Sequence, residues 1–215
     1  MELPPPPDGE QIHHRTYDVL AYRLGADRMM LRGIVHDIKP PGIYFEGDTK
    51  PLSVHHMVVD LTLDYPTLEI VEASVQMNVT PHMKCNAIEP DYQKLVGLSI
   101  ARGFSRHIKD LFGRAHGCTH IGALLQAMAP VAIQSMWSMN SANVGGDASG
   151  ESNDVTSSDE GRERAMAFNL NTCHIWAEDG ENVQAIRRGE DLEVPVWASE
   201  RLAELGRDPM EWRNS

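Results

Sequence analysis

Cysteine is scarce in this chain of 215 residues, which carries 3 cysteines at wide spacing. Cys85, Cys118 and Cys173 form an odd set, and none of them belongs to a closely spaced pair. A disulfide framework needs an even and denser set, and a structural zinc site usually draws on two clusters of paired ligands. The sequence therefore predicts reduced thiols, a cytoplasmic setting and no structural zinc site.

Long apolar runs and an excess of basic residues are also missing. No segment reaches the ~20 consecutive apolar residues of a membrane span. The N-terminus carries Glu2 and prolines at positions 4–7, where a secretory signal would carry basic and then apolar residues. The net charge of -12 leaves no basic stripe to neutralise nucleic-acid phosphates. A hydrophobic content of 41% is typical of a soluble globular protein, and we expect neither a membrane nor a nucleic acid as partner.

Several common catalytic and cofactor signatures do not occur. The chain has no Gly-x-Gly-x-x-Gly, no Walker loop, no His-Glu-x-x-His and no Gly-x-Ser-x-Gly. Each of these motifs places backbone or side-chain groups where a dinucleotide, a phosphate, a zinc ion or an acyl group binds. Their absence disfavours nicotinamide, nucleotide and serine-hydrolase functions, and we expect no cofactor.

The first part of the chain alternates apolar and polar residues with the two-residue period of β-strands. The predicted strands are residues 15–24, 28–38, 53–65 and 68–79. In the last of these, strict alternation places Leu68 and Ile70 on the face opposite to Val75 and Met77. Short connections between the strands favour an antiparallel sheet.

Helical spacing replaces alternation after Pro81. The predicted helices are residues 91–100, 104–112 and 119–139. The last of them is long and mostly apolar, so we expect it to pack against the sheet, with Pro130 kinking or dividing it. The predicted fold class is α+β, with an antiparallel sheet of about four or more strands packed by C-terminal helices.

Composition divides the chain into four segments. These are a flexible lead-in (1–12), an α+β core domain (13–140), a polar mobile linker or insert (141–161) and a short C-terminal segment packing on the core (162–215). The linker is rich in Ser, Asn, Gly and Asp and cannot bury a core. In the tail, residues 165–176 form a helix or a strand, and residues 198–205 form a short helix.

Two histidines and a thiol stand at the predicted start of the long helix, as His116, Cys118 and His120. Free backbone N–H groups and the helix dipole at such a position attract anions and activate thiols. The group can ligate a metal, move protons or hold an anionic substrate. In the structural alternative, Cys118 is a small buried hydrophobe and His120 fixes a loop by hydrogen bonding.

A second candidate lies in the middle of the sheet. By alternation, His55 shares its face with an apolar row that includes Met57, while His56 lies on the face of Asp60. His55 is therefore either a satisfied core residue or part of a pocket. A partly desolvated imidazole in a pocket suits a general base. We expect His56 to pair with Asp60.

The strand ends carry further candidates. His36 and Asp37 end the second predicted strand, and His13 and Arg15 begin the first. These positions suit a site at the rim of the sheet, and they equally suit solvated charges. Tyrosine hydroxyls can donate to a phenolate or carbonyl oxygen, and sequence does not rank Tyr17, Tyr22, Tyr44 and Tyr92.

One set of segments occurs in a characteristic order. The segments are residues 35–40, 54–57 with 61–64, 85–90, 95–100 and 117–121, with Cys173-His174 near the tail. The set resembles a bacterial family catalogued as domain of unknown function 2889 (DUF2889). The resemblance covers residues 13–140 and, more loosely, 165–190. Carried across, the family pattern marks Asp37, His55, Cys85, Gly117, Cys118, Thr119 and His120, with His13 and Arg15. This chain has His55-His56 where the family has a His-Asp pair.

The resemblance implies an enzyme of bacterial aromatic catabolism. Our first hypothesis is a cofactor-independent lyase that acts on a phenolic, lignin-derived dimeric aromatic and releases a hydroxymethyl group as formaldehyde. His55 or His120 would be the base and Asp37 an orienting carboxylate, with Cys118 completing the catalytic set. The predicted substrate-binding residues are Arg15, His13, His116 and Tyr44. The methionines Met29, Met57, Met77 and Met128 line an adaptable aromatic pocket or pack the core.

Two other classes of function stay open. A metal-dependent hydrolase or lyase would use His55, His120 and Cys118 as ligands and a bound water as nucleophile. A non-catalytic small-molecule-binding or accessory protein would use its acidic surface for protein contacts. Apolar helix faces allow a homodimer.

Overall fold

The computed structural model describes residue 5 and residues 7–144, 158–167 and 169–214. The chain forms two compact units, Met1–Ala148 and Ser149–Ser215. Of the predicted lead-in and linker, residues 1–4, 6 and 145–157 lie outside the described residues. At the two ends of the predicted linker, residues 141–144 continue one helix and residues 159–161 begin another.

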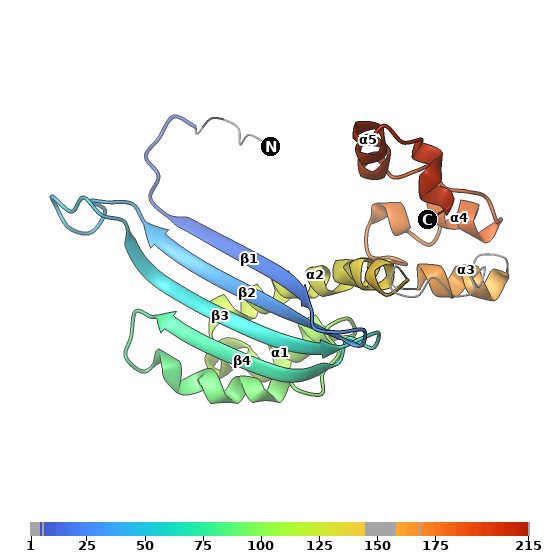
Figure 1. The fold of residues 1–215 in the computed structure, drawn as a ribbon. Coiled ribbons are helices and arrows are strands. Elements are labelled where there is room, and N and C mark those ends of the chain that lie inside the picture. Colours follow the sequence, from blue (N-terminus) through green and yellow to red (C-terminus); the bar gives the residue numbers. More distant parts are fainter. Residues whose placement is uncertain (1–4, 6, 145–157, 168, 215) are drawn as a thin grey trace. The chain divides into compact units, whose positions relative to one another are not determined.

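The first unit contains a four-stranded antiparallel sheet in the order β1-β2-β3-β4 (Figure 1). The strands are β1 (His14–Arg23), β2 (Arg28–Lys39), β3 (Leu52–Asp64) and β4 (Ile70–Val79). Strands adjacent in sequence are adjacent in the sheet, as short connections favour. The predicted α+β class is confirmed.

Strand β4 departs from strict alternation. A register shift after Thr62 leaves Val71 as an extra residue opposite β3, which is a β-bulge. Leu68 and Ile70 are consequently buried together with Met77. Their predicted place on the opposite face is wrong, because one extra residue in the strand moves the side chains of the preceding residues to the other face of the sheet.

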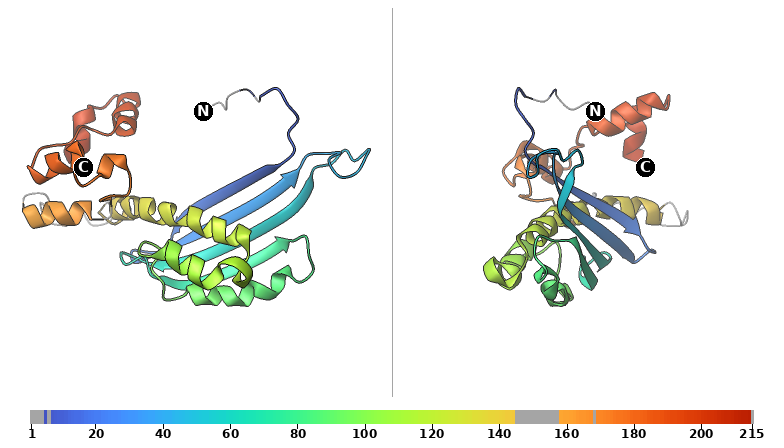
Figure 2. Two further views of the ribbon diagram at one scale, coloured as in Figure 1. Left: turned by 180° about the vertical axis from the view of Figure 1, so that it is seen from behind. Right: turned by 90° about the vertical axis from the view of Figure 1, so that its left-hand side faces the viewer.

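Helices cover one face of this sheet (Figure 2). They are η1 (Cys85–Leu95), α1 (Phe104–Phe112), η2 (Arg114–His116) and α2 (Thr119–Val144). Helix α2 buries a stripe at helical spacing that includes Ile121, Leu124, Leu125, Met128, Ala132, Met136 and Met139. The stripe packs closely on β2, where a Cβ added at Gly33 would lie 2.6 Å from the Met128 sulfur.

Two predictions about these helices are wrong. Residues 91–100 do not form a helix, because η1 ends at Leu95 and Gly97 adopts a left-handed φ of 87°. The chain there joins the sheet edge instead, and the Gly97 N–H donates to the Ile70 carbonyl at 2.8 Å. Helix α2 runs through Pro130 undivided, so the predicted division is wrong, while the alternative of a kink stays a prediction. Apolar packing on both sides of the proline, at Met128 and Ala132, holds the helix together.

The four methionines that the sequence assigns to a pocket or a core are all buried. Met29, Met57, Met77 and Met128 belong to one hydrophobic core between the sheet and the helices. A closed core leaves no space for an aromatic ligand among these side chains, so the structure favours the core alternative.

The second unit is helical. It contains α3 (Asp159–Met166), η3 (His174–Trp176), α4 (Glu181–Arg187), α5 (Val196–Glu204) and η4 (Pro209–Asn214). Residues 165–176 form neither one helix nor one strand, because turns separate α3 from η3. An ion pair of 2.7 Å between Arg187 and Glu163 links α4 to α3. In the described parts of the chain, no helix has the length and apolar character that crossing a membrane requires.

Candidate active site

Three charged or ionisable side chains form a row across the sheet. Arg15 on β1 lies directly opposite Asp37 on β2, and Asp37 lies directly opposite His55 on β3. Directly opposed residues of antiparallel strands project to the same face. The row lies at the ends of these strands, where the first turn of α2 also arrives.

Asp37 is the centre of this row. Its side chain is 1% exposed, so the solvated alternative for this strand end is wrong. Its Oδ1 accepts a hydrogen bond from Arg15 Nε at 2.5 Å, and its Oδ2 accepts one from Arg15 Nη2 at 2.6 Å. Oδ2 also lies 2.9 Å from His55 Nδ1. A buried charge needs such partners to offset its lost hydration.

The start of α2 adds an imidazole and a thiol. His120 Nε2 lies 3.5 Å from Asp37 Oδ2, and its ring stacks on that of His55 with centroids 3.8 Å apart. The Cys118 sulfur lies 3.6 Å from His120 Nδ1. We call the group of His13, Arg15, Asp37, His55, Cys118 and His120 the Asp37 cluster. It includes His13 because His13 Nε2 lies 3.5 Å from Asp37 Oδ1.

The charges of the cluster are set by the pairing of Arg15 with Asp37. The Arg15 guanidinium holds the pKa of Asp37 well below its usual range, against the opposing effect of burial. Asp37 in turn raises the pKa of Arg15. Burial lowers the pKa of His120, and the charges of His55 and Arg15 lower it further. At neutral pH the ion pair therefore persists and His120 is uncharged.

These charges fix the hydrogen positions on both rings. An ionised carboxylate only accepts, so His55 Nδ1 must donate to Asp37. The same reasoning places a proton on His120 Nε2, which faces the same carboxylate oxygen. In its neutral form, each ring then carries its lone pair on the other nitrogen, which is Nε2 of His55 and Nδ1 of His120. The first is free of any described partner, and the second faces the Cys118 thiol.

The cluster opens to the outside of its unit. Side-chain exposure rises from 16% at His55 and 20% at His120 to 33% at Arg15 and 36% at His13. Both imidazoles thus keep some contact with solvent, while the carboxylate between them is almost fully shielded from it.

A second pair of histidines lies on the other face of the sheet. His36 and His56 are cross-strand partners with ring centroids 4.9 Å apart, and His36 Nε2 lies 2.9 Å from the Ser53 hydroxyl. The predicted pairing of His56 with Asp60 is wrong, because both Asp60 oxygens accept hydrogen bonds from Arg32. These histidines do not belong to the Asp37 cluster.

The structure ranks the four candidate tyrosines. Tyr92 is buried, and its hydroxyl accepts the Cys118 N–H at 2.9 Å. Burial raises the pKa of Tyr92 to about 12, so it remains a neutral phenol. The Tyr17 hydroxyl lies 3.4 Å from Arg15 Nη1, at the edge of the cluster. Tyr22 and Tyr44 are exposed elsewhere.

Three residues singled out from the sequence lie outside the cluster. His116 is exposed in η2, and Tyr44 is exposed in the loop after β2, where Lys39 Nζ lies 5.8 Å from its ring centroid. Cys85 opens η1 and packs against the core. The substrate-binding roles of His116 and Tyr44 stay predictions.

A metal would meet a different ligand set from the predicted His55, His120 and Cys118. Asp37, His55 and His120 each offer one ligand atom, all within 4.8 Å of one another, and two histidines with one carboxylate can bind iron or zinc. However, both oxygens of Asp37 already accept guanidinium hydrogen bonds. A cation there would face the positive charge of Arg15 at close range, so the arrangement suits proton transfer better.

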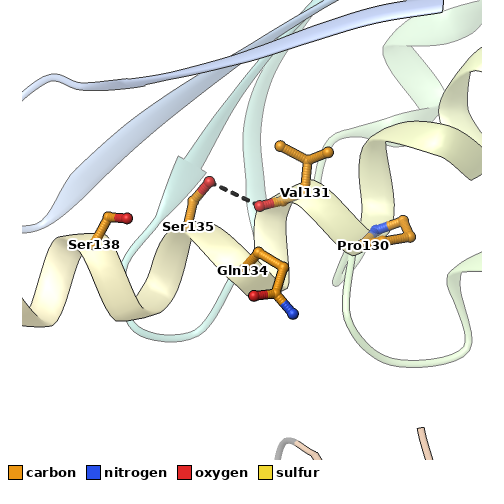
Figure 3. A pocket seen from close by; sticks show the side chains of 5 residues that line it. All are labelled: Pro130, Val131, Gln134, Ser135 and Ser138. Carbon is orange, nitrogen blue, oxygen red and sulfur yellow. Dashed lines mark hydrogen bonds between the residues drawn. The ribbon is translucent and has the colours of Figure 1, made fainter. Parts of the chain in front are cut away.

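A separate open hollow lies along α2 (Figure 3). Its lining residues are Pro130, Val131, Gln134, Ser135 and Ser138. The Ser135 hydroxyl donates to the Val131 carbonyl at 2.7 Å, as Figure 3 shows. None of the lining side chains is acidic or basic, so this hollow offers no group for acid–base chemistry.

Comparison with known proteins identifies the family. The pattern of DUF2889, described as a protein of unknown function, matches residues 13–134, which is more than half of the chain. The matched range contains every member of the Asp37 cluster. A search of curated proteins and a search of solved structures found no match. The chain belongs to the DUF2889 family.

Proposed function

We propose that the chain is a cofactor-independent carbon–carbon lyase that acts on a phenolic, lignin-derived aromatic and releases a hydroxymethyl group as formaldehyde. The observation that carries the proposal is the pairing of Asp37 with His55, in which a buried carboxylate holds Nδ1 at 2.9 Å and leaves Nε2 free. The substrate class comes from the family resemblance, and the proton-transfer chemistry comes from the Asp37 cluster.

The proposed reaction needs only proton transfers and a shift of electron pairs within the substrate. An ionised para-phenol pushes electrons through its ring and expels a benzylic oxygen, which takes up a proton, so that a quinone methide forms. A base then removes the proton of the hydroxymethyl O–H. The oxygen forms a carbonyl to its carbon as the adjacent C–C bond breaks. The released electron pair makes the new double bond and returns the ring to a phenolate, and formaldehyde leaves.

His55 is suited to both proton transfers. In its protonated form the ring also carries a proton on Nε2, which it can give to the departing benzylic oxygen. The neutral ring then takes the proton of the hydroxymethyl group at Nε2, which restores the protonated form. Asp37 fixes the ring through Nδ1, as carboxylates do for catalytic histidines in general. Each such acid or base typically contributes about 10²–10⁴-fold to the rate.

The edge of the cluster is suited to an anionic phenolate. Arg15 donates two hydrogen bonds to Asp37, from Nε and Nη2, and its Nη1 faces the Tyr17 hydroxyl. His13 is 36% exposed, more than Arg15, His55 or His120. Positive charge and N–H donors placed there stabilise developing negative charge on the substrate.

The test uses the full chain and a panel of para-hydroxyphenyl diols that carry a hydroxymethyl group next to the benzylic carbon. Stilbene absorbance in the near ultraviolet and released formaldehyde are measured in the same samples. We expect His55→Gln to lower both rates by about 10²–10⁴-fold. His120→Gln should lower them as well, because His120 stacks on His55.

His56→Gln is the matched control, since the neighbouring residue lies on the opposite face of the sheet. Equal rates in the wild type and His55→Gln would remove the proposed role of His55. No product from any diol, together with a raised melting temperature when a diol is added, would replace the lyase by a non-catalytic binding protein.

A further inference from the structure

The proposed lyase steps leave the thiol of Cys118 without a role. Its sulfur lies 3.6 Å from His120 Nδ1, and the other nitrogen of the same ring lies 3.5 Å from Asp37 Oδ2. A single imidazole therefore stands between a thiol and a buried carboxylate. This order of groups activates cysteine nucleophiles, because the ring accepts the thiol proton while the carboxylate fixes the ring.

The thiol is held in place from its backbone. The Cys118 N–H donates to the Tyr92 hydroxyl at 2.9 Å, and the Cys118 carbonyl accepts from the Gly122 N–H at 2.9 Å. Tyr92 is itself fixed, since it is 1% exposed and stacks on Phe112 with centroids 4.6 Å apart. Rigid support of this kind keeps the sulfur next to the imidazole.

The other two cysteines lack this arrangement. Cys85 packs against the core, and Cys173 is exposed in the second unit. Among the described residues, no imidazole lies within hydrogen-bonding distance of either sulfur. The chain thus supplies two internal references for the reactivity of Cys118.

We propose that Cys118 is a nucleophilic thiol that adds reversibly to a small aldehyde, with His120 as its base. The identity of the aldehyde as formaldehyde rests on the proposed function, because that reaction would release formaldehyde beside this thiol. The nucleophilic character of Cys118 rests on the contacts alone.

The addition balances without an oxidant or a reductant. The thiol proton moves to His120 Nδ1, and a sulfur electron pair forms a bond to the carbonyl carbon. The carbonyl π pair moves to the oxygen, which takes the proton back from His120. The product is a hemithioacetal, S–CH2–OH, and the reverse steps free the aldehyde. Formaldehyde would thus be bound for a time instead of reacting at random with nearby amines.

The first test measures alkylation by iodoacetamide at each cysteine of the full chain, by mass spectrometry of its peptides. We expect Cys118 to react at least about tenfold faster than the exposed Cys173, since general base catalysis typically exceeds that factor. His120→Gln should remove the difference. His116→Gln is the matched control, because it replaces the histidine that lies equally far from Cys118 in sequence but outside the cluster.

A rate at Cys118 no higher than that at Cys173 would overturn the proposal, as would an unchanged rate in a folded His120→Gln. The second test repeats the alkylation with formaldehyde present, which should slow Cys118 more than Cys173. A matching measurement follows [13C]formaldehyde by NMR, where the hemithioacetal signal of the wild type should vanish in Cys118→Ser. Fast alkylation without protection by formaldehyde, and without that signal, would overturn the aldehyde as ligand.

Neither test uses the lyase substrate. A chain that releases no formaldehyde from any diol can therefore still show the reactive thiol, and an unreactive thiol leaves the lyase steps of His55 untouched.

Discussion

Replacing Asp37 with Asn tests whether the charge of this carboxylate holds the cluster together. Asn has the same size, but it turns an amide N–H2 towards a guanidinium that also donates, so at least one of the two hydrogen bonds with Arg15 is lost. Removing one partner of a buried ion pair typically costs about 3–5 kcal/mol. Arg15 is 33% exposed, and water can hydrate its unpaired charge. We therefore expect a lower cost of about 2–3 kcal/mol in the free energy of unfolding.

Differential scanning calorimetry measures this cost. In a chain of this size, a loss of about 2–3 kcal/mol lowers the melting temperature by about 4–12 °C. Asp60→Asn is the matched control, because Asp60 accepts two hydrogen bonds from Arg32 at 2.8 and 2.7 Å. That pair is much more exposed, at 43% for Arg32 and 20% for Asp60. Its loss should therefore lower the melting temperature by less than the loss of the Asp37 charge does.

The stability that the Asp37 charge contributes should depend on pH in one direction only. The pKa of Asp37 in the folded chain lies below the value of about 3.9 for an unfolded Asp. The unfolded chain therefore binds more protons as the pH falls, and the stability that the charge contributes is present above about pH 4 and is lost below it. The gap between the wild type and Asp37→Asn should narrow below about pH 4. A gap that stays constant there, or equal losses for Asp37→Asn and Asp60→Asn, would refute this reasoning.

Three further predictions concern packing, protonation and metal content. Gly33→Ala should destabilise the chain by about 1–3 kcal/mol in denaturant unfolding, because its Cβ would lie 2.6 Å from the Met128 sulfur. At Gly122 in α2 an added Cβ would meet open space, so Gly122→Ala should stabilise the chain by up to about 1 kcal/mol. If both variants changed the free energy of unfolding in the same direction, the close packing of Met128 on Gly33 would be contradicted. The pKa of His120 is lower in the folded chain than in the unfolded chain, so the unfolded chain takes up a proton at a higher pH. The free energy of unfolding should therefore fall as the pH drops below about 6.5, and it should fall less in His120→Gln. Elemental analysis should find no stoichiometric metal, and chelation should leave formaldehyde release unchanged. One equivalent of iron or zinc whose removal abolishes that release would establish the metal-dependent alternative.

Part of the Asp37 cluster could be read from the sequence by counting. Strands β1 and β2 are joined by a short turn in which the Leu24 N–H donates to the Arg28 carbonyl at 3.0 Å. Counting back from this turn places Arg15 opposite Asp37. Because a tight turn fixes the register of a hairpin, this pair follows from local sequence alone.

The rest of the cluster depends on contacts that no local pattern specifies. Residues 40–51 separate β2 from β3, and a connection of that length does not set a register. A bulge at Val54, between the pairs Asp37–His55 and Ile38–Ser53, also shifts the pairing there. His120 arrives only because α2 docks on the sheet, with Met128 seated over Gly33. The family resemblance thus grouped Asp37, His55, Cys118 and His120 as one catalytic set, but the sequence did not specify the contacts that bring them together.

The pairing of Arg15 with Asp37 explains how a carboxylate can hold two imidazoles without charging His120. An uncompensated carboxylate beside a histidine favours the protonated ring, since opposite charges attract. Here the guanidinium neutralises Asp37 through two hydrogen bonds, and burial together with Arg15 and His55 lowers the pKa of His120 despite the nearby carboxylate. Arg15 thus holds Asp37 through two N–H donors, and its role in binding substrate stays a proposal. Asp37 paired in this way presents no unpaired negative charge to repel a phenolate, and the neutral His120 keeps Nδ1 available for the proton of the Cys118 thiol.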